Sequence, residues 1–237
     1  MSVTKTLTIV VAAAVKNHGI AIGKENPWRL PKDLAYFNKV TETVIGASTK
    51  DSNNASDEKL MPASGIPLMN ACILGRKTWE ALPKRHQPLK NRYNIVVTSD
   101  PNLLGDEEPK FTVTQPSVQA ALKFIDDMNS TGAGKQPARI DRVFITGGGG
   151  IYDEVLKMDD RDVQILITYV QLHDEDKCNA CDAFFPPLDT NKYKRQPHSR
   201  LEDVVSFKVP SGPQVEGELE YEFLLYEKEA AASSASD

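Results

Sequence analysis

The chain has 237 residues, of which 40% are hydrophobic, and a formal net charge of −5. This length and composition suit a soluble α/β unit, and the acidic balance gives no electrostatic footprint for nucleic acid or an anionic membrane. No apolar run approaches the length of about 18 residues that a membrane-spanning helix requires. The start has neither the cleavage site of a signal peptide nor the Arg-rich character of a transit peptide. Three cysteines, an odd number, fit a reducing compartment, so we expect a cytoplasmic protein.

Strand-like and helix-like segments alternate along the chain. Apolar and β-branched runs predict strands at 6–15, 70–74, 93–98, 142–146, 163–170, 204–209 and 221–227. Helical patterns fall at 34–40, 77–82, 118–128 and 151–157. Repeated strand–helix–strand units predict an α/β fold with a mainly parallel twisted sheet and helices on both faces. The last two strands are expected to pair as an antiparallel C-terminal edge.

We expect one domain over residues 1–228. Two polar stretches, near 46–65 and 129–138, have few large apolar residues, and we expect mobile surface loops there. The Ala/Ser-rich tail at 229–237 is expected to be disordered. Cys178 and Cys181 are spaced as in metal or redox motifs, but they lie in a polar segment without a second cysteine pair. Chance spacing is favoured, and no metal site is predicted.

Asp33 follows the sequence Pro27-Trp28-Arg29-Leu30-Pro31-Lys32 and opens a helix. Phe37 is four residues later, so both side chains lie on one helix face. A carboxylate beside a flat apolar ring suits a flat heteroaromatic ligand with an amidine-like edge. The alternative is an ordinary acidic helix start, favoured by the macrodipole and by the proline before it.

Four glycines, 147–150, lie between a predicted strand and a predicted helix. Glycines let the backbone approach a ligand closely, and the helix N-terminus presents free N–H groups to a phosphate. A flexible turn is the alternative. The spacing is not G-x-G-x-x-G and no acidic residue follows at the required distance, so a standard Rossmann ribose site is not predicted.

A second strand-to-helix junction reads Gly75-Arg76-Lys77-Thr78. Cations at a helix N-terminus oppose the macrodipole, so an anionic partner would explain them, and a solvated basic patch is the alternative.

Arg92 follows the turn 88–91. Its planar fork matches a ligand carboxylate, although an arginine after a turn is usually a surface charge.

In this order, the features resemble dihydrofolate reductase, especially its fungal members. The resemblance covers residues 6–228. It rests on Gly19-Ile20, Pro27-Trp28, Asp33 with Phe37, Gly-Arg-Lys-Thr-Trp at 75–79, Pro-Leu-Lys-x-Arg at 88–92, the glycine turn with Ile151-Tyr152, and the segments 182–186 and 221–226.

The resemblance implies roles for individual residues toward the substrate. Asp33 would bind the 2-amino group and N3 of the pterin, Trp28 would hold a water near that acid, and Thr168 would hydrogen-bond the acid. Arg92 would pair with the α-carboxylate of the glutamyl tail. The implied substrate-binding set is Ile20, Asp33, Phe37, Leu82, Arg92, Thr146 and Tyr152.

The implied cofactor is NADPH. Its implied binding residues are Ala13, Ile20, Gly75, Arg76, Lys77, Thr78, Thr98, Ser99, Gly148, Gly149, Gly150, Ile151 and Tyr152. The resemblance also implies a cis peptide between Gly147 and Gly148.

Three positions depart from the family pattern: Ala21 replaces a glycine of the active-site loop, and Ser99 and Pro116 stand where relatives have arginines toward the adenosine 2′-phosphate. The resemblance therefore implies that this protein holds the 2′-phosphate with fewer charges, through Arg76 and Lys77.

The implied function is NADPH-dependent reduction of 7,8-dihydrofolate to 5,6,7,8-tetrahydrofolate in one-carbon metabolism. The alternatives are the NADPH-dependent pyrimidine reductase of riboflavin synthesis, which shares this fold, and a non-catalytic folate-binding protein. The expected partners are dihydrofolate and antifolate inhibitors, with no nucleic acid or membrane, and the protein is expected to be a monomer. Burial of Asp33 among Trp28, Phe37 and Leu82 should raise its pKa, because burial outweighs the helix dipole.

Overall fold

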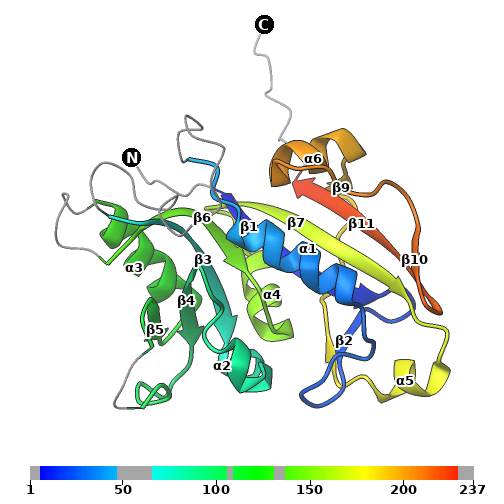
Figure 1. The fold of residues 1–237 in the computed structure, drawn as a ribbon, viewed down its shortest axis with the longest axis horizontal. Coiled ribbons are helices and arrows are strands. Elements are labelled where there is room, and N and C mark those ends of the chain that lie inside the picture. Colours follow the sequence, from blue (N-terminus) through cyan, green and yellow to red (C-terminus); the bar gives the residue numbers. More distant parts are fainter. Residues whose placement is uncertain (1–5, 47–65, 106–108, 131–136, 229–237) are drawn as a thin grey trace, which may run out of the picture.

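The computed structural model describes residues 6–46, 66–105, 109–130 and 137–228, which form a sheet covered by helices (Figure 1). The strands are β1 Thr6–Ala14, β2 Gly19–Ala21, β3 Leu68–Gly75, β4 Arg92–Val97, β5 Thr112–Gln115, β6 Arg139–Ile145, β7 Asp162–Gln171, β8 Ala183–Phe184, β9 Tyr193–Arg195, β10 Gln214–Glu216 and β11 Leu219–Lys228. The helices are α1 Pro31–Glu42, α2 Arg76–Ala81, the 3-10 helix η2 Lys84–His86, α3 Val118–Ser130, α4 Gly149–Leu156, α5 Glu175–Ala180 and α6 His198–Val205.

The main sheet has nine strands in the order β10-β11-β7-β1-β6-β3-β4-β5, and β9 pairs with β11. All neighbours from β7 to β5 are parallel, whereas β11 runs antiparallel to β7, β10 and β9. Ile9 of the central strand β1 is in register with Ile145 on one side and Ile165 on the other. The predicted fold, a mainly parallel sheet with an antiparallel C-terminal edge, is confirmed.

Helices cover both faces of the sheet, which explains why β1 is a nearly continuous apolar run. Alternate residues of β1 belong to two core clusters, with Ile9 in one and Val10 in the other. The cluster of Ile9 receives the buried faces of α3 and α4, and that of Val10 receives those of α1 and α6. The two layers hold the sheet in place from both sides.

Most predicted elements are present with slightly wider bounds, but the predicted strand at 204–209 is wrong. That segment includes the end of α6, which stops where Ser206 adopts a left-handed conformation with φ of 63°. Leu201, Val204 and Val205 are buried with helical spacing, so the valines belong to an amphipathic helix face. The antiparallel partners of β11 are instead β7, β9 and β10.

Parts of the other predictions lie outside the described residues. Of the insertion expected near 46–65, only Gly46 is described, and its backbone N–H donates to Asp141 Oδ2. Of the stretch 129–138, Asn129 and Ser130 belong to α3 and residues 131–136 are not described. The tail at 229–237 is not described either. Within the described ranges, no helix has both the length and the apolar character that crossing a membrane demands.

Candidate active site

Most of the predicted site residues gather where the parallel strands end and the following helices begin, whereas Arg92 lies at the start of β4. The carboxyl ends of parallel strands meet at one edge, which is where ligands bind in open α/β sheets. At this edge the turn after β3 meets the turn after β6: the Gly75 N–H donates to the Gly147 carbonyl at 2.7 Å, and the Thr146 N–H donates to Ile73 O at 2.9 Å. Two loops more than seventy residues apart in sequence thus form one surface.

Helix α1 begins beside this edge with Pro31, and Asp33 is its third residue. Within the described structure, the residue before the helix, Leu30, provides no side-chain cap. A distant carboxylate partly replaces that cap, because the Lys32 backbone N–H donates to Glu216 Oε2 at 3.2 Å. Glu216 lies on β10, 184 residues away, and no local pattern in the sequence indicated this contact.

The Asp33 carboxyl group has a perturbed acidity. Its pKa is raised to about 6, mainly by burial; a hydrogen bond with the Thr168 side chain acts to lower it, and the Glu216 carboxylate adds to the rise. Thr168 is buried on β7, opposite Ala12 of β1. The expected raised pKa is confirmed, and the structure brings Asp33 and Thr168 together as the resemblance implied.

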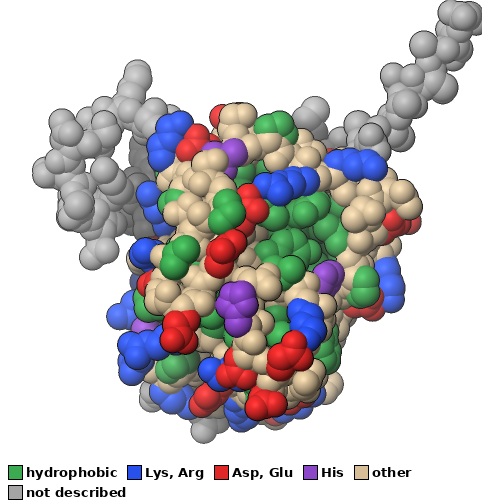
Figure 2. All heavy atoms as spheres, turned by 90° about the vertical axis from the view of Figure 1, so that its right-hand side faces the viewer, with side chains coloured by type: hydrophobic (Ala, Val, Ile, Leu, Met, Phe, Trp, Pro, Cys, Tyr) green, Lys and Arg blue, Asp and Glu red, His purple; other side chains and the backbone are tan. Residues whose placement is uncertain are grey.

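The apolar residues predicted around this carboxyl group belong to the core cluster that α1 packs into. Trp28 is buried in the core cluster beneath α1, and Phe37 and Leu82 pack against that cluster while remaining partly exposed. Leu34, which is adjacent to Asp33 and is not among the predicted site residues, is 56% exposed. Figure 2 faces the side of the molecule that carries β10 and α5, the right-hand side of Figure 1, and shows hydrophobic side chains exposed among charged ones on that face.

The glycine turn after β6 lies against the start of α2. The Gly147–Gly148 peptide bond is cis, as the resemblance implied, and Gly147 has a φ of 129°. A β-carbon at Gly147 would lie 3.0 Å from Thr78 Oγ1, whereas one at Gly150 would have no described atom within 4 Å. The turn is thus close-packed on the α2 side and open at Gly150, the second residue of α4.

This open turn fits an anionic cofactor group. The Ile151 and Tyr152 N–H groups donate to Gly148 O, which leaves the N–H groups of Gly149 and Gly150 as those that a helix start offers to a phosphate. Arg76 and Lys77 begin the neighbouring helix α2. The Arg76 side chain is half-exposed and pairs with Glu80 Oε1 at 2.7 Å. Gly75, which precedes α2, packs against Ile151, with a β-carbon there reaching Ile151 Cγ1 at 3.3 Å.

The remaining predicted cofactor residues lie around this edge. Ala13 is buried in β1, and Ile20, on β2, packs against the same core cluster. The Tyr152 hydroxyl is buried and donates to the Val10 carbonyl of β1 at 3.1 Å. Thr98 follows β4 and its N–H donates to Gln115 O, while Ser99 is exposed.

Arg92 is a buried cation at the start of β4, with its side chain only 4% exposed. Its guanidinium donates from Nε to Lys90 O at 2.8 Å and from Nη1 to Asn38 Oδ1 at 3.1 Å and Thr41 Oγ1 at 2.8 Å. Nη2 pairs with Glu42 Oε1 at 3.0 Å. Thr41 is eight residues after Asp33, a rise of about 12 Å along α1. The Asp33 carboxyl group and the Arg92 guanidinium, which donates to Thr41, therefore lie on either side of Phe37 along α1. Their separation suits an elongated ligand.

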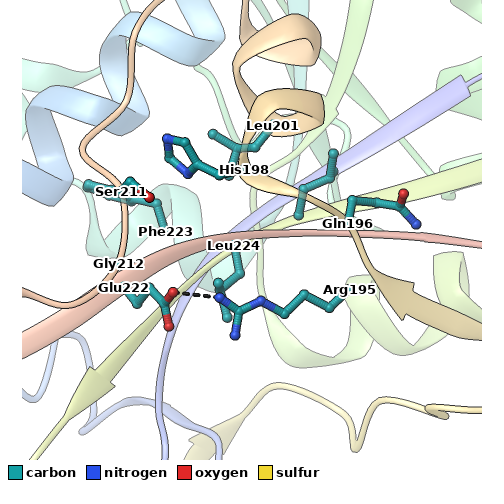
Figure 3. Close-up of a pocket in the computed structure, with 10 residues that line it drawn as sticks. Arg195, Gln196, His198, Leu201, Ser211, Gly212, Glu222, Phe223 and Leu224 are labelled. Carbon is teal, nitrogen blue, oxygen red and sulfur yellow. Dashed lines mark hydrogen bonds and ion pairs between the residues drawn. The ribbon is translucent and has the colours of Figure 1, made fainter.

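A separate hollow lies between β9, α6 and β11 (Figure 3). Its volume is about 220 Å³, and its lining includes His198 and the ion pair of Arg195 with Glu222. The predicted site residues lie elsewhere, so the hollow is not part of the candidate active site.

Comparison with known proteins agrees with this arrangement. The family model for dihydrofolate reductase matches residues 65–208. The chain belongs to the dihydrofolate reductase family. It is similar to the dihydrofolate reductases of Pneumocystis carinii, with 31% identity over 97% of this chain and 100% of the relative, and of Candida albicans, with 29% identity over 93% and 96%. The solved structure of Schistosoma mansoni dihydrofolate reductase aligns with a TM-score of 0.66 at 27% identity, covering 94% of this chain and 97% of that one.

Family membership answers the functional question that the sequence left open. The protein is an oxidoreductase of folate metabolism that reduces dihydrofolate with a nicotinamide cofactor. The pyrimidine reductase of riboflavin synthesis and a non-catalytic folate-binding protein are not favoured. The region before residue 65, which carries Asp33, lies outside the family match but within the alignment to the Pneumocystis relative, which covers nearly the whole chain.

Proposed function

We propose that this enzyme transfers a hydride from NADPH to 7,8-dihydrofolate and that Asp33 is the group that binds and polarises the pterin. The observation that carries the proposal is the buried Asp33 carboxyl group, which is hydrogen-bonded with the Thr168 side chain and has a pKa raised to about 6. A carboxyl group in such surroundings accepts hydrogen bonds from the 2-amino group and N3 of a pterin and favours the protonated ring.

The substrate would lie along α1. The pterin would contact Asp33 and Phe37, with Leu82 and Leu34 beside the aminobenzoyl ring, and the glutamyl tail would reach Arg92. Trp28 would hold a water molecule near Asp33. N5 of the pterin would receive its proton through water, because a carboxyl group bound to the 2-amino edge is too far from N5 to deliver it directly.

The cofactor site is proposed at the two glycine-bounded turns. NADPH, when bound, supplies the hydride that the reaction needs at C6 of dihydrofolate. The N–H groups of Gly149 and Gly150 would receive the pyrophosphate, and Arg76, Lys77 and Thr78 would bind the 2′-phosphate side. Helix starts and cations at one edge support an anionic cofactor. The choice of NADPH over NADH rests on Arg76 and Lys77, since Ser99 supplies no charge.

The test is consumption of NADPH, followed at 340 nm, on addition of dihydrofolate. Asp33→Asn should fold, because the change is isosteric, but should lose about 100-fold or more in kcat at pH 7. Activity should recover as the pH falls, because substrate that is already protonated bypasses the missing acid. A variant with the wild-type rate at pH 7 would show that Asp33 does not have this role.

We also propose that the enzyme works as a cytoplasmic monomer that binds antifolate inhibitors at the dihydrofolate site. Cys72, Cys178 and Cys181 are free and buried, which supports a reducing compartment. Gel filtration together with light scattering would determine the mass in solution.

A further inference from the structure

Arg92 already binds a carboxylate of its own chain. Its side chain is 4% exposed, and Glu42 Oε1 lies 3.0 Å from Nη2. A buried cation requires a compensating partner, and Glu42 supplies it from the last residue of α1. Glu42 itself is 37% exposed, so its carboxylate can turn to water without becoming buried and unpaired.

The guanidinium does not depend on Glu42 for its orientation. Nε and Nη1 donate to Lys90 O, Asn38 Oδ1 and Thr41 Oγ1. These three bonds come from the backbone before β4 and from α1, and they hold the plane of the fork. Nη2 is therefore the donor that can change its carboxylate partner while Arg92 stays in place.

We propose that Glu42 is a specificity-determining residue: it occupies the carboxylate position of Arg92 in the free enzyme and competes there with the glutamyl carboxylate of the substrate. The inference rests on the proposed function, in which the substrate tail reaches Arg92. Binding of a tailed ligand then requires Glu42 to leave Nη2 and to hydrate, and the negative charge of Glu42 repels the incoming carboxylate. A ligand without a tail leaves the Arg92–Glu42 pair intact and meets no such competition.

The test uses Glu42→Gln, which removes the charge and keeps the shape. Its KM for dihydrofolate should fall about 2- to 5-fold, because the variant loses a competing partly exposed ion pair and such pairs contribute little binding energy. The kcat and the KM for NADPH should not change. The KM for dihydrobiopterin, which lacks the glutamyl tail, should not change. Glu227→Gln is the matched control, because it breaks a comparable pair, Arg200 with Glu227 at 2.7 Å between α6 and β11, and should leave both substrates unaffected.

A double-mutant cycle separates competition from a merely structural role. In an Arg92→Leu background, Glu42→Gln should no longer lower the KM for dihydrofolate, because the contested cation is gone. Should Glu42→Gln be too unstable to assay, Glu42→Asp, whose shorter side chain weakens the pair with Nη2, should lower the same KM to a smaller extent.

Three results would overturn the inference: an unchanged or raised KM for dihydrofolate in Glu42→Gln, an equal fall for dihydrobiopterin, or a fall that persists without Arg92. These results are distinct from failure of the proposed function. In that case the wild-type enzyme itself would not consume NADPH when dihydrofolate is added.

Discussion

At the scale of single residues, Asp33 is subject to two opposing effects. A carboxylate at the third position of α1 is stabilised by the helix dipole by about 0.3–1 kcal/mol, which would lower its pKa. Burial and the neighbouring Glu216 act in the opposite direction and prevail, since the pKa rises to about 6. The site keeps an acid that is costly to ionise, and this cost should be measurable as stability.

Asp33→Asn should stabilise the free enzyme at neutral pH. The folded-state pKa of about 6 exceeds the unfolded value of about 3.9, so the contribution of the carboxyl group is fully favourable below pH 4 and is lost as pH rises through 6. The asparagine side chain does not ionise, so the stability of the variant does not decrease over this pH range for that reason. We expect the free energy of unfolding of the variant to exceed that of the wild type by about 1–3 kcal/mol above pH 7.

Urea denaturation of both proteins at pH 4 and pH 7.5 would measure this difference. The gain should be large at pH 7.5 and close to zero at pH 4. A gain of the same size at both pH values would mean that the amide stabilises the fold by packing, and that the acid does not ionise at a cost.

The candidate site residues differ in whether the sequence signals them. Asp33, Phe37 and the glycine turn were predicted because each has a local signal: a helix start, a spacing of four, a run of small residues. Glu216 and Glu42 have no such signal. Their roles depend on which side chains the folded chain brings together, and Glu216 reaches α1 from 184 residues away.

At the scale of elements, the approach of β8 to α4 limits what the glycine turn can tolerate. A β-carbon at Gly149 would lie 2.6 Å from the Phe184 carbonyl oxygen. This is a backbone atom of the short sheet formed by β2 and β8, and it cannot rotate away as a side chain would. The first residue of α4 and β8, the strand that pairs with β2, are therefore held in contact.

Gly149→Ala should separate α4 from β8. Overpacking of this kind costs about 1–3 kcal/mol, and the shift should also weaken NADPH binding, because the same helix start forms the proposed pyrophosphate site. Thermal unfolding and the KM for NADPH would measure the two effects. Gly150→Ala is the stability control: its β-carbon would meet no described atom within 4 Å, so the free energy of unfolding should not fall. Equal losses in both variants would contradict the contact with Phe184.

The errors in the predicted elements have one physical cause in the short strands and another in α6. The long strands and helices were predicted because their burial imposes a clear period. The short strands β2, β8, β9 and β10 have three residues or fewer, too few to show a period, and tertiary pairing alone defines them. In α6, adjacent valines suggested a strand, but their spacing from Leu201 is helical and the helix packs beneath β11.

At the scale of the whole molecule, the two proposed ligands contact different layers. The substrate would lie against α1, whose buried face belongs to the core cluster of Trp28 and Tyr36. The cofactor would lie at the start of α4, which packs into the cluster of Tyr152 and Val155 on the other face of the sheet. Each ligand therefore ties a different layer to the carboxyl edge of the sheet.

NADPH should raise the melting temperature of the enzyme. A ligand that binds the folded state alone stabilises it by about 2.7 kcal/mol at 100 times its dissociation constant, which corresponds to about 5–10 °C for a chain of this size. NADH at the same concentration should give a smaller shift, because it lacks the 2′-phosphate that Arg76 and Lys77 would meet. Differential scanning fluorimetry at low and high salt would measure both shifts, and the difference between them should shrink at high salt through screening.

Ser99→Arg tests whether that difference arises at the end of β4. Ser99 is exposed there, and an added arginine near the 2′-phosphate is worth about 0.2–1 kcal/mol. The variant should enlarge the shift with NADPH by a few degrees at most and leave the shift with NADH unchanged. If both cofactors gain equally, the side chain at position 99 does not face the 2′-phosphate, and the preference for NADPH must then come from Arg76 and Lys77 alone.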